Sequence, residues 1–455
     1  MTVNPGFVAH GLPAAISRRG TGYVAANGRR EGLGIWSYIR GLSVSQWLLL
    51  SYPVVIRVVS RSRAPEEAFA VDTSAMVQVA FTALCGAYAC TRLLGRRGNL
   101  HAILARRPMI WLLLYGVLGI VSAIWSEQPD FTLYRAVELT IFLILSVDAM
   151  AKAHDLRTMV RFQMMFAAVV IALGMVVPSG LAIAGMHSSE VPGTVAGVAF
   201  VGLLVRGPVW RLLYLVVLAA VVLGTSAGTF VSIAIGLGIM LVSLRGRWAG
   251  VGAILLAGMV GLGVANNFDF DRYIFWGKSE SDIRTGSGRL LVWEWVLREK
   301  ISQKPVLGYG FGVGETLARM SDPTVSTLQM MHMHSASMSA LANLGGVGLL
   351  LLLLFLVDIW RSSWKLSRAR AGPALLGAMV TVCANSQLIA SVTSTMSVGA
   401  IGHCLLFSTI AVASYTVAAW AKTVPARGAV TAEGTGTTAL NRSASLGMPA
   451  RGLRP

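Results

Sequence analysis

The stretch MHSASMSALANLGGVGLLLLLLFLVDIW, residues 333–360, joins a polar start to a long apolar run and decides the class of fold. From Met338 to Trp360 it is close to the length that a helix needs to cross a bilayer, about 20 predominantly apolar residues. Apolar blocks of similar length recur along the chain, separated by short polar turns. This pattern predicts an all-α polytopic membrane protein.

The overall composition indicates the same class of protein. Of the 455 residues, 55% are hydrophobic and only 13% are charged, whereas soluble domains carry roughly 25% charged residues. The mean hydropathy is +0.66. Residues 1–40 contain no early apolar core, so we expect no cleaved signal peptide.

The apolar blocks predict about twelve transmembrane helices. The first is the weakest, because Pro53 and Arg57 interrupt it. The expected spans are residues 43–60, 74–94, 109–125, 131–150, 159–178, 192–206, 209–224, 226–244, 248–265, 338–360, 374–393 and 399–420.

The Lys and Arg residues predict which side of the membrane each loop occupies. The formal net charge is +18, but most basic residues fall in loops on one side of the expected spans, as the positive-inside rule describes. The first turn on the other side, with Arg61 and Arg63, departs from the rule. The charge is therefore interpreted as a topology signal, with both termini cytoplasmic and no nucleic-acid partner.

One segment is long enough to form a sizeable extramembrane element. An odd number of crossings precedes residues 266–337, so we expect one large periplasmic loop between the ninth and tenth spans. No internal repeat is evident, which disfavours an inverted-repeat transporter. The predicted parts are a disordered cytoplasmic tail (1–40), spans one to nine (41–265), the loop (266–337), spans ten to twelve (338–421) and a second disordered cytoplasmic tail (422–455).

Arg135 lies in the segment IWSEQPDFTLYRAVELT (124–140), close to the start of the fourth span. A cation at that depth is costly to bury and usually has a partner or an anionic ligand. Two interpretations stay open. The guanidinium binds an anionic substrate, or it pairs with Glu138 three residues later or extends to the lipid headgroups.

The large loop contains a second basic region. Arg284 and Arg289 flank a Gly/Ser turn that precedes the stretch RLLVWEWVLREKISQKP (289–305). Small residues before a helix N-terminus favour anion binding, although a solvated surface turn explains the pattern equally well.

The stretch 289–305 itself predicts an amphipathic helix that ends at Pro305. Its apolar stripe consists of Leu290, Trp293, Leu297 and Ile301. Such a helix lies either along the membrane interface or over the top of the helix bundle.

Alternating glycines follow this helix in the segment PVLGYGFGVGE (305–315). The earlier Gly/Ser turn between Arg284 and Arg289 is neither a Walker A loop nor a dinucleotide fingerprint, because no strand precedes it. Gly308, Gly310 and Gly312 are expected to form a tight, closely packed turn rather than a phosphate cradle.

Two histidines, His332 and His334, stand just before the tenth span. A metal pair is disfavoured, because positions i and i+2 of a helix face different directions and no acidic or cysteine cluster accompanies them. The four cysteines fall in expected spans without metal spacing, and we expect no disulfide.

His334 differs from His332 in its helical spacing. Met338, Leu341 and Gly345 follow it at steps of four, three and four, which places all four residues on one expected inward face. An inward histidine at this depth is either a hydrogen-bonded structural residue or a catalytic one.

In this order, the motifs resemble the O-antigen ligase and polysaccharide polymerase superfamily of bacterial inner membranes. That family typically shows a His with apolar residues at +4 and +7 and Gly at +11. Upstream it has a Gly-Arg before a Trp-bearing helix, then Pro with alternating glycines, and earlier a Trp-Ser…Pro…Arg-Ala segment. The matching residues, within roughly 40–420, are Arg135, Gly288, Arg289, Trp293, Pro305, Gly308, Gly310, Gly312, His334, Met338, Leu341 and Gly345.

Two positions depart from the family pattern. Ser335 follows the histidine where relatives commonly have Asn, and Ala227 stands where many members have Arg or Lys. The second departure shifts the expected anion binding to Arg135 and Arg289, with Arg284 in reserve.

The resemblance implies a GT-C-like glycosyltransferase with an undecaprenyl-pyrophosphate-linked oligosaccharide donor and acceptor in the lipid bilayer. A flippase and a chain-length co-polymerase are candidate partners. His334 is expected to act as the base toward the acceptor hydroxyl, and Arg135 and Arg289 to bind the pyrophosphate, with inversion and without cofactor or metal. The expected substrate-binding residues are Arg284, Trp293, Gly308, Gly310 and Gly312.

Three functions compete at this point. The segments Trp125–Arg135 and Gly308–Gly312 look closer to exopolysaccharide polymerases, which favours a polymerase. A ligase that transfers the glycan to lipid A core or protein is the alternative. A transporter would carry charged residues midway through several spans, whereas the notable cations here gather at one face and in one loop.

Overall fold

The structure is a computed structural model. It describes residues 35–59, 72–95, 99–153, 155–176, 190–223, 227–244, 289–314, 333, 335–369, 371–388 and 397–423. Residues up to Thr416 form one compact unit and residues 417–455 a second, of which only the end of the last helix, to Thr423, is described.

All regular secondary structure in the described residues is helical. The α-helices are α1 (Ile35–Arg40), α2 (Val44–Val59), α3 (Thr73–Leu94), α4 (Leu100–Leu104), α5 (Met109–Val121), α6 (Pro129–Ala151), α7 (Leu156–Val176), α9 (Glu190–Val201), α10 (Pro208–Leu223), α11 (Ala227–Ser243), α15 (Arg289–Trp295), α18 (Ala336–Leu366), α19 (Gly372–Leu388) and α20 (Val398–Thr423). Two 3₁₀ helices, η4 (Ser122–Ile124) and η5 (Gly202–Leu204), extend α5 and α9, and a π-helix, η6 (Val296–Ile301), extends α15.

Every expected span that falls on described residues coincides with a helix. The expected span 248–265, and the expected loop before Arg289, lie outside the described residues. Four helical segments of the described chain are long and apolar enough to cross a membrane. They are Ala75–Leu94, Leu156–Met175, Ala336–Leu366 and Gly399–Ala419. The prediction of an all-helical membrane protein is confirmed, while the number of twelve spans and the place of the loop stay predictions.

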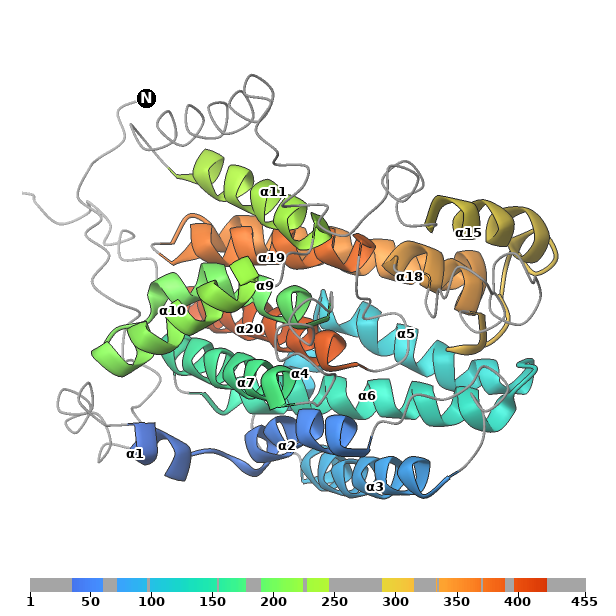
Figure 1. Cartoon of the computed structure of the whole chain (residues 1–455), viewed down its shortest axis with the longest axis horizontal. Helices are drawn as coiled ribbons and strands as arrows, with labels where there is room; N and C mark the ends of the chain where they lie inside the picture. Colours follow the sequence, from blue (N-terminus) through green and yellow to red (C-terminus); the bar gives the residue numbers. More distant parts are fainter. Residues whose placement is uncertain are drawn as a thin grey trace, which may run out of the picture. The chain divides into compact units, whose positions relative to one another are not determined.

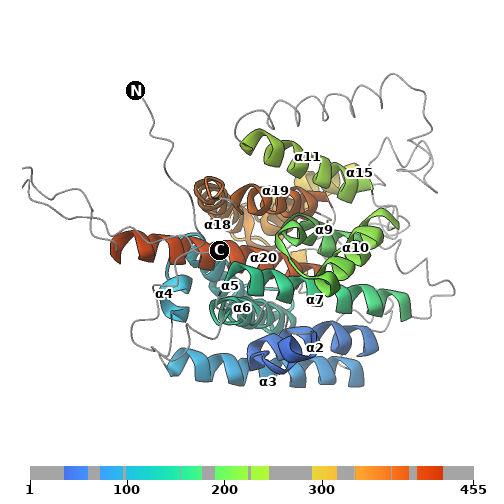
Figure 2. The same cartoon turned by 90° about the vertical axis from the view of Figure 1, so that its left-hand side faces the viewer.

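Helix α6 is central to one group of helices and packs against α2, α3, α4 and α5 (Figure 2). Pro129 begins the helix, where its missing N–H costs no hydrogen bond. Much of the helix is buried, including Ala136, Leu139 and Phe142. This packing fixes the direction in which polar residues near its first turns project.

A second group contains α9, α11, α18 and α19, with α19 packed against the other three (Figure 1). Polar groups between these helices are bonded across the interface. The Asn385 amide of α19, for example, donates to the Thr229 hydroxyl of α11 at 3.2 Å. Because α18 also packs against α5, it joins the two groups.

Acidic residues within the helices neutralise several of the basic ones. Asp148 of α6 pairs with Arg92 at 3.0 Å and with Lys152 at 2.6 Å. Asp358 of α18 accepts a hydrogen bond from the Trp111 indole at 2.8 Å and lies 3.7 Å from Arg107. In these contacts the acidic and the basic side chains neutralise each other, so we interpret them as structural. The candidate site residues lie instead near the first turns of α6 and α18.

Candidate functional site

Helix α18 is broken near its start. Gly345 has φ 64° and ψ −159°, a combination essentially restricted to glycine. In an unbroken α-helix, the N–H groups of Gly346 and Val347 would donate to the carbonyls of Ala342 and Asn343. The break leaves all four backbone groups in need of other partners.

The glycine loop, defined here as residues 305–314, supplies those partners. Two of its carbonyls accept from the N–H groups beyond the break, and two of its N–H groups donate to the carbonyls before it. The bonds are Gly346 N to Pro305 O (2.8 Å), Val347 N to Val306 O (3.3 Å), Tyr309 N to Ala342 O (3.1 Å) and Gly310 N to Asn343 O (2.9 Å). The loop therefore takes the place of two rungs of the helix.

The glycines make this close backbone contact possible. Gly308, Gly310 and Gly312 all have positive φ, which disfavours residues with a side chain. At Gly310, with φ 105°, a Cβ atom would also come within 2.5 Å of the Ser126 hydroxyl. The prediction of a tight, closely packed turn is confirmed, and direct substrate binding by these three glycines stays a prediction.

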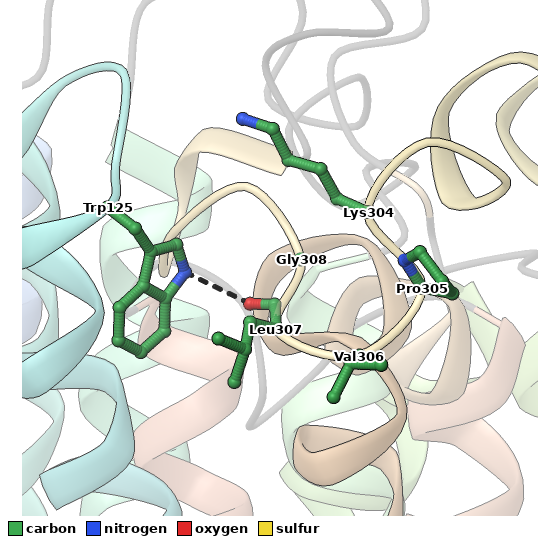
Figure 3. A pocket seen from close by; sticks show the side chains of 6 residues that line it. All are labelled: Trp125, Lys304, Pro305, Val306, Leu307 and Gly308. Carbon is green, nitrogen blue, oxygen red and sulfur yellow. Dashed lines mark hydrogen bonds between the residues drawn. The ribbon is translucent and has the colours of Figure 1, made fainter.

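The connection between α5 and α6 holds the other side of the glycine loop. The Trp125 indole donates to the Leu307 carbonyl at 3.1 Å, and Phe311 N donates to the Ser122 hydroxyl at 3.0 Å. An open hollow of about 300 Å³ lies beside this contact (Figure 3). Its lining residues are Trp125, Lys304, Pro305, Val306, Leu307 and Gly308.

A charged pair stands at the rim of this hollow. Lys304 lies 3.2 Å from the Glu127 carboxylate and 4.4 Å from the centre of the Tyr309 ring. Burial, together with the Glu127 charge, raises the pKa of the Tyr309 hydroxyl. Both members of the pair are well exposed, so the ion pair contributes little to stability. It gives the hollow a polar edge, whereas most of the residues that line the hollow are apolar.

Arg135 projects from the second turn of α6 and is paired. Its Nη1 lies 3.0 Å from Oε2 of Glu138, whose side chain is only 1% exposed. The other carboxylate oxygen accepts from the hydroxyls of Tyr52 (3.1 Å) and Tyr134 (3.3 Å). Phe131 and Tyr134 also present their rings to the guanidinium. The pairing with Glu138, one of the interpretations that the sequence left open, is present.

The pairing fixes the Arg135 guanidinium without enclosing it. One fifth of the side chain stays exposed, and its buried Nε has no hydrogen-bond partner among the described residues. An arginine has five N–H donors in a rigid plane, so one carboxylate contact does not exhaust it. Anion binding by Arg135 stays a prediction that the pairing does not contradict.

The amphipathic helix predicted over 289–305 is present but shorter, and its buried face differs. It runs as α15 and the π-helix η6 to Ile301, four residues before Pro305. Val292 and Val296 are buried against Met333 and Ala342, whereas two members of the predicted stripe are exposed. These are Leu290 and Leu297, at 53% and 46%. The apolar spacing left open whether lipid or protein covers this helix, and the positions that protein covers are Val292 and Val296.

Of the site residues predicted on this helix, Trp293 and Arg289 are described. The Trp293 indole donates to the Met333 carbonyl at 2.8 Å, so it contacts the residue immediately before His334. Arg289 is half-buried at the first position of α15, and burial lowers the pKa of its guanidinium. α15 and η6 thus cover the start of α18 (Figure 1), as one of the two expected placements required.

His334, His332 and Arg284 lie outside the described residues. The neighbours of His334 are described. Ser335 is the N-cap of α18, and its hydroxyl accepts from Met338 N at 3.3 Å. α18 thus begins two residues after His334.

The buried face of the first turns of α18 is carried by small and polar residues. Ser339, Ala340 and Asn343 are at most 1% exposed, whereas Met338 and Leu341 are half-buried. Gly345, the last member of the predicted face, stands at the break. Met338 packs against the cluster of Val292, Val296, Met333 and Ala342, so the predicted face is partly covered by protein, and the most deeply buried positions lie beside it.

The predicted residues fall into two sets. Trp293, the glycine loop and the residues beside His334 are brought together on α18. Arg135 belongs to a separate network on α6, whose contacts in the described chain are with Tyr52, Phe131, Tyr134 and Glu138.

Sequence reasoning missed Tyr52 and Gln387. The Gln387 amide oxygen accepts from Ser337 N at 3.2 Å and from the Ser335 hydroxyl at 3.4 Å. No local motif marks either residue, since their partners lie 86 and about 50 residues away in the chain.

Comparison with known proteins indicates which family the chain resembles. No curated protein matches the chain. Residues 212–353 match a family model described as O-Antigen ligase. The matched range contains α11, α15, the glycine loop and the first half of α18, together with His334, and it does not reach Arg135. The predicted resemblance to O-antigen ligases is confirmed over residues 212–353.

Proposed function

We propose that this protein polymerises undecaprenyl-pyrophosphate-linked oligosaccharide repeat units on the periplasmic face of a bacterial inner membrane. The O-antigen ligase match at residues 212–353, which covers the glycine loop and the start of α18, supports action on a lipid-linked glycan. The choice of a polymerase rests on the segments Trp125–Arg135 and Gly308–Gly312. Both termini are cytoplasmic in this proposal, as the distribution of Lys and Arg indicates.

The proposed reaction is an inverting glycosyl transfer that needs no metal. His334 accepts the proton of the acceptor sugar hydroxyl while that oxygen attacks the anomeric carbon of the donor. The bond between the anomeric carbon and the pyrophosphate oxygen breaks, and undecaprenyl pyrophosphate leaves. Arg135 and Arg289, with Arg284 in reserve, bind the negative charge that develops on the leaving group.

Two features of the structure support these roles. Arg289 begins the helix that also places Trp293 against Met333, next to the proposed base. Arg135 is held in one orientation by Glu138 and keeps donors for a ligand. Arg135 and Arg289 come from different helices, α6 and α15, which suits a substrate with a large lipid-linked pyrophosphate.

Replacement of the proposed base is the direct test. His334→Ala should lower the rate of polymer formation by about 10²–10⁴-fold, the usual contribution of a general base. The measurement is polymer length on gels in a strain lacking the chromosomal copy, normalised to the amount of protein in the membrane. His332→Ala is the matched control and should behave as the unaltered protein. Normal polymer with His334→Ala would remove the proposed base.

The ligase and the transporter predict different products in the same deletion strain. Loss of a polymerase leaves single lipid-linked repeat units, whereas loss of a ligase leaves lipid-linked polymer that is not attached to its acceptor. A transporter would move lipid-linked oligosaccharide across liposomes without forming a glycosidic bond. Either of the last two results would replace the proposed function.

A further inference from the structure

The residues on both sides of His334 are held by side chains from two other helices. On one side, the Met333 carbonyl accepts from the Trp293 indole at 2.8 Å. On the other side, Gln387 of α19 accepts from Ser335 and Ser337. Met333 and Ser335 are 1% and 3% exposed, so both residues that flank the proposed base in the sequence are packed in the interior.

Gln387 acts as a helix cap supplied from another helix. The first N–H groups of α18 have no partner within the helix. The Ser335 hydroxyl takes the N–H of Met338 at 3.3 Å, and the Gln387 amide oxygen takes the N–H of Ser337 at 3.2 Å. An amide oxygen has two lone pairs, and the second accepts from the Ser335 hydroxyl at 3.4 Å.

The side chain that provides this cap belongs to a helix that packs against α18. Gln387 is the second-last residue of α19, which packs along α18. A side chain on a packed helix holds its partner more closely than one on a loop. The amide oxygen therefore fixes the position at which α18 begins relative to α19. Through its bond to Ser335, it also holds the residue that directly follows His334 in the sequence.

We propose that Gln387 is a positioning residue for His334 in the glycosyl transfer. The inference rests on the proposed function, in which His334 is the base. Gln387 does not touch the reacting atoms in this proposal. It holds the first turn of α18 so that the base keeps its distance to the acceptor hydroxyl, a distance to which rates are sensitive at about the 1 Å level.

The test compares three substitutions of Gln387 in purified, detergent-solubilised full-length protein. The substrate is the lipid-linked repeat units that accumulate in the deletion strain. Gln387→Glu keeps an acceptor oxygen at the same reach, and its charge suits a helix N-terminus, so it should retain activity. Gln387→Met keeps the length and loses the acceptor, while Gln387→Asn keeps the amide and shortens it.

Gln387→Met and Gln387→Asn should each lower kcat by about 100-fold. KM should stay within about twofold, because the donor-binding groups are unchanged. The folded fraction by size-exclusion chromatography should equal that of Gln387→Glu. Unchanged kcat in the folded Met or Asn variant would overturn the proposal. So would a rise in KM without a fall in kcat, or a loss of activity that follows only the loss of folded protein.

His334→Ala, measured beside them, separates the two proposals. If it is inactive while Gln387→Met and Gln387→Asn are fully active, the base stands and the positioning role is wrong. If His334→Ala is fully active, the proposed base is wrong, whatever the Gln387 variants do.

Discussion

The start of α6 and the start of α18 each carry a residue proposed to act on the substrate, but they are supported differently. On α6, Arg135 is oriented by Glu138 three residues later in the same helix. On α18, the residues beside His334 are held by Trp293, 40 residues from Met333, and by Gln387, 52 residues from Ser335. One support is local, and the other is assembled only when distant helices pack.

The difference has a physical origin in the two kinds of bond. A salt bridge at i and i+3 forms as soon as the helix forms, and its members face each other by helical geometry. A cap from another helix depends on the packing of both helices, so its strength is tied to the tertiary structure. Substitutions in α6 should therefore act through charge, and substitutions in α18 through backbone geometry.

The largest effect is expected from Arg135→Gln. Removal of the cation leaves the buried Glu138 carboxylate unpaired, which costs about 3–5 kcal/mol in buried ion pairs. The hydroxyls of Tyr52 and Tyr134 still donate to it, so we expect the lower end of that range. The midpoint of thermal unfolding in detergent measures this loss.

A second variant tells whether the pair is structural or binds substrate. Arg135→Gln combined with Glu138→Gln removes both charges and should recover most of the unfolding free energy. If Arg135 binds the pyrophosphate, the double variant is folded but inactive. Full activity of the folded double variant would show that the arginine serves only its partner.

Gly345→Ala should have the next largest effect. The backbone conformation at this position costs about 1–3 kcal/mol for a residue with a side chain, and a Cβ atom would collide with the carbonyl group of Val306. We expect lower thermal stability and loss of polymer formation, because the glycine loop could no longer bond to α18. Gly346→Ala is the matched control, since its nearest neighbour, the Pro305 carbonyl oxygen, lies at 3.4 Å. Equal behaviour of the two variants would show that the break in α18 is dispensable.

The smallest effect is expected at Ser335. Ser335→Ala removes the N-cap and should cost about 1 kcal/mol, seen as a modest fall in the unfolding midpoint. Ser335→Asn should be close to neutral, because Asn and Ser are equally good N-cap residues. This offers a physical reason for the departure from the family pattern at this position. A change in acceptor preference with Ser335→Asn would instead assign the position a role in specificity.

The sequence predicted the helices well and the contacts between them poorly. Apolar blocks placed the helices to within a few residues, since hydrophobic length and helix boundaries are local properties. The same apolar spacing left open which face of 289–301 meets protein, and there Val292 and Val296 are covered while Leu290 and Leu297 are exposed. A face that meets lipid and a face that meets protein are both apolar, so spacing alone does not distinguish them.

The tight turn of the glycine loop was predictable, but the surface it contacts was not. Alternating glycines indicate backbone conformations that other residues avoid. That Gly310 bonds to Asn343, and that Gly345 breaks α18 to receive the loop, depends on two segments meeting in space. Backbone hydrogen bonds between distant segments leave no mark in side-chain periodicity.

The sequence by itself determined an all-helical membrane protein and its likeness to O-antigen ligases, and it offered the local pair of Arg135 with Glu138 as one interpretation. Hydrophobic length, ordered motifs and helical spacing are properties of short segments. Only the tertiary structure decided how α18 begins and where it breaks. Its caps come from Ser335 and Gln387, and its broken rungs are completed by the glycine loop. The Ser335 cap is local to α18. The bonds from Gln387 and the glycine loop satisfy backbone groups that α18 cannot satisfy alone, and they exist only once the helices have packed.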